Sequence, residues 1–520
     1  MLCACCCIAA YPQSINQSVE VSNEFESVIG DVNKLGVGMS VPDSLLSFEY
    51  DFDYSVFDSP YKGAYEFTPY TIQINPEASR FDGRKLYLKA GAGFLFHPEL
   101  EAVFAPVADE KSAMSVYADA GGYAQADGHD LWGDAGFENR WVLPNSVAVV
   151  GAGYDGVFTQ DAHGSINYNS GRFSAGIKSV SEGSYLYYDV RLDGRFGREG
   201  FYQMANQNEG ALRLSGTAGP VIRDKYRFLL DFVVRQSFSS GIDRSSRTYL
   251  SLLPHLSFLL GPADLDAGLK IDYAGDLIFS PVVEASFSVL GKETNLYAGL
   301  SGGQKPMTLY DHKMANHRFN TYWMYDRRSD SFSGFGIVER EKMNVYGGIR
   351  GHIGPHFQYS LRAGYAVSGN TPLESLNSTG NILYTFNDVK SFYGRASLSW
   401  KSEKADFTAN GELNKATLDE GAVCFAPALI KGDARFNYNI SGRVRAGASL
   451  DVSSSRAALG MKGVDSIPSY VDLGINAGYK VNSRWGVWLK GGNLLGQRIQ
   501  RIPTYVEKGP YFTAGITLSL

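Results

Sequence analysis

The stretch from Tyr185 to Phe196, which reads Tyr-Leu-Tyr-Tyr-Asp-Val-Arg-Leu-Asp-Gly-Arg-Phe, alternates between apolar and charged side chains. Its apolar positions are Leu186, Tyr188, Val190 and Leu192, and its charged positions are Asp189, Arg191, Asp193 and Arg195. Successive side chains of a β-strand point to opposite faces of the sheet. The stretch therefore predicts a strand with one apolar face and one face on which opposite charges alternate.

The same alternation recurs along the chain and is clear in residues 433–440 and 443–452. The polar face of these two segments carries the charged residues Asp433, Arg435, Arg443 and Arg445. One such segment alone would suit a soluble sandwich, whose apolar faces share a core. Roughly twenty in series, with no linker between them, favour the wall of a closed barrel that has lipid outside and a polar interior.

The composition agrees with a membrane barrel. The chain of 520 residues has 58 Gly, 32 Tyr and 30 Phe, spread evenly from Gly63 to the end. It contains no uncharged apolar stretch of about 18–20 residues, the length that a helix needs to cross a bilayer. In lipid, only helices and closed barrels pair every backbone polar group. A membrane protein with this sequence must therefore cross as strands.

Turn-forming clusters separate the predicted strands at hairpin spacing. They include residues 143–146, 260–263, 353–356, 438–442 and 481–484, which are typical of antiparallel up-and-down pairing. At about 20–27 residues for each strand with its connection, residues 85–520 hold roughly 16–22 strands. The predicted fold class is all-β: a transmembrane antiparallel β-barrel with a short N-terminal segment in the periplasm or the lumen.

Residues 1–10 are apolar, include Cys3, Cys5, Cys6 and Cys7, and end in small residues. We interpret them as a secretion signal. Because no positive residue precedes the apolar run, the true start is expected upstream of Met1. Lipid attachment at a cysteine and a metal site are less favoured interpretations, since metal-binding cysteines usually form spaced pairs. Residues 11–84 form a lead-in, and after removal of the signal only Cys424 remains.

The chain ends in an amphipathic strand, Tyr511-Phe-Thr-Ala-Gly-Ile-Thr-Leu-Ser-Leu520. One of its faces carries Phe512, Ala514, Ile516, Leu518 and Leu520. This strand resembles the C-terminal signal that the outer-membrane assembly machinery reads. The signal usually ends in Phe or Trp, so Leu520 departs from it. The alternative interpretation is the buried last strand of a soluble domain.

Residues 469–485, Asn493-Leu-Leu-Gly-Gln-Arg498 and 509–515 resemble the end of a TonB-dependent receptor barrel. There a strand ends in an Asn-Leu-Phe-type turn, and an outer loop precedes the closing strand. The resemblance implies an outer-membrane receptor, but residues 11–84 contain no recognisable TonB box and no complete plug domain. In this respect the chain looks like plugless TonB-receptor-like proteins of Bacteroidetes.

The sequence offers no motif for catalysis. It has no Gly-x-Ser-x-Gly elbow, phosphate loop, His-Glu-x-x-His helix or spaced cysteine pair, so we expect neither an enzyme nor a cofactor or metal. The net charge is −6 without a basic stripe, which argues against nucleic acid as a partner. His312 and His317 lie in a polar, aromatic stretch, and we expect a solvated loop there rather than a metal site.

Two functions remain open for a barrel of the Gram-negative outer membrane. In the first, the charged faces named above line a lumen through which a solute passes. In the second, the barrel is a structural or accessory subunit, and residues 11–84 dock a periplasmic or outer-membrane protein. Both predict outer-membrane lipids and the assembly machinery as partners. Conductance or uptake would favour the first, and a sealed barrel in a stable complex would favour the second.

Overall fold

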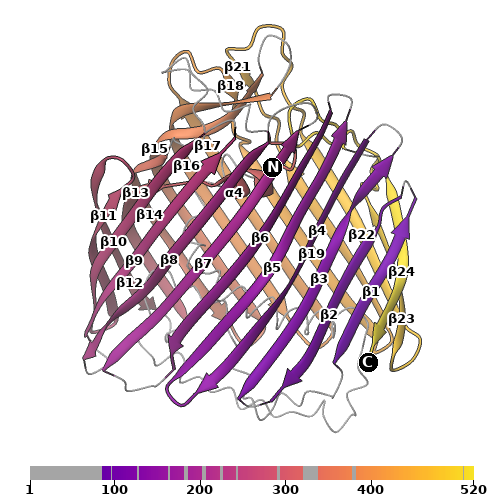
Figure 1. Ribbon diagram of the computed structural model, residues 1–520, viewed down its shortest axis with the longest axis horizontal. Helices are drawn as coiled ribbons and strands as arrows, with labels where there is room; N and C mark the ends of the chain where they lie inside the picture. The colour runs from indigo at the N-terminus through magenta and orange to yellow at the C-terminus, as the bar shows by residue number, and fades with distance from the viewer. Residues whose placement is uncertain are drawn as a thin grey trace.

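Twenty-two strands form one closed antiparallel barrel in the computed structural model of this chain (Figure 1). The structure describes residues 85–520 apart from 95, 110, 126–127, 162–163, 181–184, 202–205, 223–225, 242–243, 290–292, 320–337, 377–381 and 508. The predicted signal 1–10 and lead-in 11–84 lie outside the described residues. Within the described part of the chain, no helix is long and apolar enough to cross a membrane.

The first half of the barrel consists of β1 (Leu86–Gly93), β2 (Glu99–Ala108), β3 (Ser112–Gln125), β4 (Gly128–Leu143), β5 (Ser146–Asp161), β6 (Gly164–Ser179), β7 (Leu186–Phe201), β8 (Gln207–Ile222), β9 (Tyr226–Ser240), β10 (Ser245–Leu260), β11 (Ala263–Tyr273) and β12 (Leu277–Val289). Each strand pairs with the next along the chain, so the wall is built from successive hairpins.

The second half consists of β13 (Thr294–Lys305), β14 (Glu339–Ile353), β15 (Phe357–Leu376), β16 (Ile382–Lys401), β17 (Ala405–Leu418), β19 (Ile430–Ser441), β20 (Val444–Ser453), β22 (Tyr470–Lys480), β23 (Trp485–Gly492) and β24 (Tyr511–Ser519). Three further elements lie in connections: the helix α4 (Leu309–Ala315) and the strands β18 (Cys424–Phe425) and β21 (Ala458–Leu459), which pair with each other.

The first and the last described strands close the barrel. Strand β1 pairs with β2 on one side and with β24 on the other. The carbonyl of Leu520 accepts hydrogen bonds from the backbone N–H groups of Lys85 and Leu86, at 2.5 and 2.9 Å. Because closure pairs both would-be edge strands, no open sheet edge faces lipid, as a membrane requires. The strand number lies at the upper end of the predicted range.

The two rims differ in the length of their connections. All of the turn clusters predicted from sequence lie at the rim that also holds the C-terminus, in the connections β4–β5, β10–β11, β14–β15, β19–β20 and β22–β23. The opposite rim carries the long connections, including those that hold α4, β18 and β21 (Figure 1). Outer-membrane barrels have short periplasmic turns and longer external loops. The rim with the C-terminus is therefore the periplasmic one.

The outer face of the wall is apolar. Along β7, Leu192 and Phe196 are exposed, whereas the alternate charged positions are partly covered. Near the periplasmic rim, exposed aromatic side chains form a belt: Trp141, Tyr226, Trp400, Tyr438, Tyr479 and Trp485. Such belts lie at the membrane–water interface of outer-membrane barrels. The chain is therefore an integral membrane barrel of the outer-membrane type.

Tyrosine rings on the inner face pack over glycines of neighbouring strands. Tyr297 of β13 lies over Gly348 of β14, where an added Cβ would come within 2.6 Å of the ring. Tyr346 of β14 lies in the same way over Gly299 of β13, again at 2.6 Å. Only a residue without a side chain leaves room for these rings. The glycine-rich composition thus serves the close packing of the wall.

Candidate functional site

The connection between β13 and β14 contains a short folded piece, residues 306–319, which we call the inner segment. Its helix α4 begins after Thr308, whose hydroxyl accepts a hydrogen bond from the Asp311 N–H at 3.2 Å. The Asp311 carboxylate accepts one in return from the Thr308 N–H at 2.8 Å. This reciprocal arrangement is a capping box, which satisfies helix N–H groups that have no partner within the helix.

Two neighbouring strands of the wall hold the start of the inner segment. Arg235 of β9 donates a hydrogen bond to the Pro306 carbonyl at 3.1 Å. The Glu209 carboxylate of β8 accepts one from the Leu309 N–H at 2.8 Å. Both contacts join backbone groups of the segment to charged side chains of the wall. The segment is therefore fixed to the wall from its first residues.

The inner segment connects opposite walls of the barrel. Its Leu309 and Phe319 are fully buried in one apolar cluster. The other members of that cluster are Val157 of β5, Tyr168 of β6, and Ile382 and Tyr384 of β16. Strands β5 and β16 are 16 − 5 = 11 strands apart, half of the 22 in the ring. Ile382 and Tyr384 lie where the β15–β16 hairpin extends past the last pair of β16 with β17, Val389 with Leu418, so the segment bridges the ring at its external end.

A buried ion pair fixes the middle of the inner segment. The Lys313 Nζ lies 2.5 Å from the Glu199 carboxylate of β7, and both side chains are 0% exposed. Lys313 also donates to the Phe319 carbonyl. The pKa of Lys313 is lowered, because the effect of burial is larger than the opposing effect of the neighbouring Glu199 carboxylate. Removing one partner of such a pair leaves an uncompensated buried charge, so the pair stabilises this one docked position.

Aromatic rings surround His312 on the same segment. Its imidazole stacks on Phe319 with ring centroids 4.8 Å apart, and Tyr384 of β16 meets Phe319 edge-on at 5.1 Å. Burial lowers the pKa of His312 to about 4, against the opposing effect of Asp311. The ring is therefore neutral near pH 7. The prediction of a solvated loop was wrong for His312, because long-range packing covers a stretch that is locally polar.

His317 is not buried in this way. It lies 3.2 Å from the Asp130 carboxylate of β4 and keeps 29% of its side chain exposed. The two histidines thus contact different groups. Across the described ranges, no set of three or more His, Cys, Asp and Glu side chains is placed to hold a metal ion.

A second external connection, residues 493–510 between β23 and β24, meets the inner segment. The Arg318 guanidinium lies over the Tyr505 ring at 3.7 Å. Ile502 packs against the apolar cluster that joins the two walls. From the same connection, Arg501 forms ion pairs with Glu507 and, at 3.0 Å, with Asp472 of β22. Two external connections therefore contact each other at the external mouth.

A cap of external elements covers the β15–β16 hairpin, whose strands are the longest in the barrel. Leu373 of β15, Val389 of β16 and Cys424 of β18 are buried together. Arg456, which precedes β21, pairs with Glu374 of β15 at 2.9 Å. This cap packs against β16, the strand that carries Tyr384. It therefore supports the contact between Tyr384 and Phe319 of the inner segment.

Below the inner segment, the wall from β4 to β7 carries a charge network. The Asp155 carboxylate binds both Arg172 and Arg195, the latter at 2.5 Å, and Arg172 also pairs with Asp134 at 2.6 Å. The Arg195 guanidinium lies over the ring of Tyr310 in the inner segment at 3.3 Å. Of the residues singled out on β7, Arg195 is thus the one in contact with the mouth.

The other charged residues singled out on β7 pair locally. Arg191 donates to Asp193 at 2.7 Å, and Asp189 lies 3.5 Å from Lys178 of β6. Both contacts lie nearer the periplasmic rim than Arg195 does, since β7 runs outward from that rim. The structure therefore splits this predicted set between the mouth and the lower wall.

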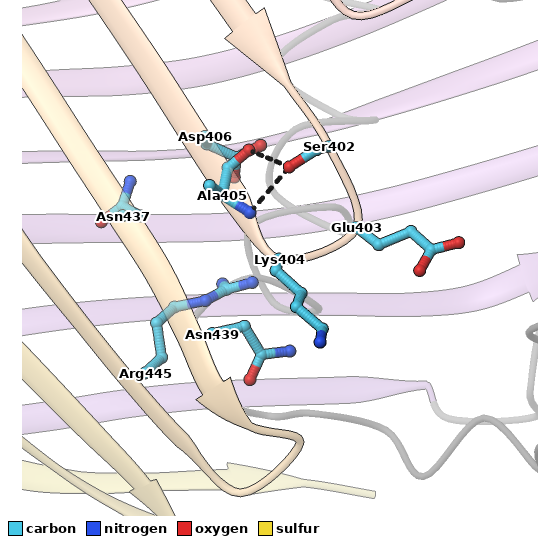
Figure 2. Close-up of a pocket in the computed structure, with 8 residues that line it drawn as sticks. All are labelled: Ser402, Glu403, Lys404, Ala405, Asp406, Asn437, Asn439 and Arg445. Atoms are coloured by element: carbon cyan, nitrogen blue, oxygen red, sulfur yellow. Dashed lines mark hydrogen bonds between the residues drawn. The ribbon is translucent and has the colours of Figure 1, made fainter.

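The set singled out near the end of the chain is spread along the wall: Asp433 lies near the external end of β19, and Arg443 and Arg445 lie at the periplasmic rim. Asp433 of β19 accepts a hydrogen bond from Asn410 of β17 at 3.1 Å, and Arg435 is exposed. Arg443 precedes β20 in the periplasmic turn. Arg445 lines a polar pocket of about 190 Å³ at this rim, together with Ser402, Glu403, Lys404, Ala405, Asp406, Asn437 and Asn439 (Figure 2).

The assembly-signal residues lie on β24 and just after it. Phe512, Ile516 and Leu520 are exposed on the outer face, whereas the alternate residues Thr513 and Thr517 are buried. Ala514 is exposed as well, and Leu518 is partly covered. This apolar face is open to lipid. Recognition of these residues during assembly stays a prediction.

Sequence reasoning missed the inner segment. The only local signal for it is the spacing Thr308-x-x-Asp311, which predicts the start of a helix. That spacing carries no information on where the helix packs. The contacts that place it join residues such as Lys313 and Glu199, which are distant in sequence.

No protein-family model and no curated protein sequence matches this chain. Among solved structures, the copper transporter OprC is similar at 12% identity and a TM-score of 0.62, over 84% of this chain and 80% of that one. The siderophore receptor PirA from Pseudomonas aeruginosa is similar at 15% identity and a TM-score of 0.59, over 84% of this chain and 80% of that one. The ferripyoverdine receptor of the Pseudomonas aeruginosa outer membrane is similar at 11% identity and a TM-score of 0.62, over 84% of this chain and 72% of that one. The fold is that of the TonB-dependent receptor barrel.

Proposed function

We propose that this chain lets a solute pass across the outer membrane, with the inner segment as the gate of the external mouth. The observation that carries the proposal is the contact of residues 306–319 with opposite walls of a polar-lined barrel. A barrel of 22 strands is too wide for wall side chains alone to fill it. A segment that docks across such a lumen can close it, and can open it by undocking.

The fold supports the same class of function. The structures similar to this chain include a copper transporter and siderophore receptors, and on that likeness we propose uptake as the direction of passage. The charged residues of β7, β19 and β20 would then line the path. The proposal also includes kinship with plugless TonB-receptor-like proteins of Bacteroidetes, and a role for residues 11–84 in docking a partner protein.

A specific observation favours the second candidate, a sealed accessory barrel. Both side chains of the Lys313–Glu199 pair are 0% exposed, and His312, Phe319 and Tyr384 are buried as well. Contacts of this kind could hold the mouth closed permanently. The barrel would then serve a partner as a scaffold and pass nothing.

Single-channel recording on the full chain in planar bilayers separates the two functions. We expect the unaltered protein to be closed most of the time, with short openings. Lys313→Ala removes one partner of the buried Lys313–Glu199 pair, which costs the docked state about 3–5 kcal/mol. The open fraction should therefore rise strongly in this variant.

A matched variant tests whether the gate itself is responsible. Lys313→Met combined with Glu199→Gln removes both charges and keeps the side-chain volumes, so docking should persist and the pore should stay closed. If Lys313→Ala folds as a barrel and remains sealed, the gate proposal fails and the accessory function is favoured. If all three proteins conduct equally, the inner segment does not close the lumen.

A further inference from the structure

Among the described strands, three pairs of arginines face each other directly across neighbouring strands of the wall. They are Arg172 with Arg195, Arg362 with Arg395, and Arg213 with Arg235. Like charges directly opposite each other destabilise a sheet. Each pair therefore needs a negative group nearby, and the three pairs differ in whether the chain supplies one.

The first two pairs have partners within the protein. Asp155 binds both members of the Arg172–Arg195 pair. The Arg362–Arg395 pair stacks on tyrosine rings, with Arg362 at 3.6 Å from the Tyr346 ring centroid. A carboxylate also lies near that pair, since Glu412 is 3.7 Å from Arg395. In both cases the wall offsets the repulsion between the guanidinium groups.

The third pair has no such partner. Within the described residues, neither Arg213 of β8 nor Arg235 of β9 forms an ion pair within 4.0 Å, and the Arg213 Nε is buried without a hydrogen bond. The one hydrogen bond made by Arg235 goes to the Pro306 carbonyl of the inner segment. Two cations thus face each other, and no carboxylate of the described residues lies within 4.0 Å of either, although Asp193 and Asp311 are close enough to act on Arg213 through their charge.

The nearest carboxylates are engaged elsewhere. Asp193, directly opposite Arg213, accepts from Arg191 at 2.7 Å. Asp311 caps α4 through Thr308. Glu209 accepts from the Leu309 N–H. Each of these carboxylates thus already has one oxygen in a contact that holds the inner segment or the wall.

We propose that Arg213 and Arg235 form a binding site for an oxyanion, a carboxylate or phosphate group of the solute, directly beneath the inner segment. Both side chains are only partly covered, so a ligand in the lumen reaches them. Guanidinium groups bind such anions through paired, charge-assisted hydrogen bonds. This inference rests on the proposed passage of a solute and adds its chemical class.

Binding of inorganic phosphate and of benzoate to the full chain in detergent, followed by calorimetric titration, tests the site without any transport step. We expect at least one probe to bind the unaltered protein, and Arg213→Gln to weaken that binding about tenfold, the effect of losing one charge-assisted hydrogen bond. Arg213→Lys, which keeps the charge, should weaken it less. Binding of phosphate alone or of benzoate alone identifies the preferred oxyanion.

Arg172→Gln is the matched control, because it alters an arginine pair that Asp155 already bridges. Heat-modifiable gel mobility shows that each variant is a folded barrel. Equal weakening by Arg172→Gln and Arg213→Gln, or no binding of either probe to the unaltered protein, overturns the site. Normal probe binding by a barrel that never conducts leaves the site in place and refutes the proposed passage instead.

Discussion

The external and the periplasmic halves of the barrel interior are held together by different kinds of contact. At the external mouth, the inner segment joins β5 and β6 to β16, on opposite sides of the ring. In the lower wall, rings and charges pair between neighbouring strands, as Tyr297 does with Arg350 of the next strand at 4.5 Å. Closure of the mouth and stability of the wall should therefore respond to different substitutions.

The largest effect is expected for Phe319→Ala in the mouth. Phe319 is fully buried against His312 and Tyr384, and such truncations cost about 3–5 kcal/mol. We expect frequent opening in bilayer recordings and an unchanged unfolding transition of the barrel. The control is Phe357→Ala at the periplasmic end of β15, which should leave opening unaltered. A sealed Phe319→Ala barrel would break the distinction between the two halves.

The next effect concerns the lower wall. Gly348→Ala would place a Cβ against Tyr297 and the Leu361 carbonyl, and overpacking of this kind costs about 1–3 kcal/mol. We expect a lower denaturant midpoint for the barrel with no change in opening. Gly394→Ala is the matched control, because an added Cβ there meets nothing within 4 Å. Increased opening in Gly348→Ala would show that wall and gate are coupled.

Acid should open the mouth. The pKa of His312 is lowered to about 4 in the docked segment by burial, whereas an exposed histidine has a pKa near 6.5. Between these values the undocked His312 binds more protons, so its contribution to docking is constant above about pH 6.5 and weakens as the pH falls toward 4, by up to about 1.4 kcal/mol per pH unit.

Conductance recorded between neutral pH and mild acid tests this effect. His312→Phe keeps the stacking ring and removes the titration, so its opening should depend much less on pH in the same range. If the unaltered protein and His312→Phe respond to acidification equally, His312 is not buried in the closed state.

The smallest effect is expected at the edge of the mouth. Asp130 and His317 are 3.2 Å apart and partly exposed, and pairs of this kind contribute about 0–1 kcal/mol. Asp130→Asn should change the open fraction only slightly. A change as large as that of Phe319→Ala would mean that the edge of the mouth, and not its buried centre, holds the segment in place.

The wall could be predicted from the sequence because its signals are local. Alternation along residues such as Asp189 to Arg195 fixes which side chains share a face, and turn clusters such as 143–146 fix the pairing of neighbouring strands. The number of strands could be predicted only as a range, because the connections between strands differ in length. The alternation along residues 511–520 predicted the last strand, β24, which pairs with β1.

The mouth could not be predicted in this way. The partners of Lys313 and Phe319 lie on strands far away in the sequence, and which strands face each other depends on the number in the closed ring. Polar neighbours made His312 look solvated, although packing against Phe319 and β16 covers it. The arginine pairs also needed the register, because Arg213 and Arg235 become neighbours only when β8 and β9 are aligned.

The position of the inner segment is the central claim, and distances between spin labels test it most directly. One label would replace Met314 of α4, and a second would replace either Phe158 of β5 or Lys415 of β17, all of which are exposed. A segment docked across the lumen predicts one narrow distance distribution to each wall. Broad distance distributions to both walls would contradict the account. So would a short distance to one wall combined with a distance to the other wall that is larger than the width of the ring.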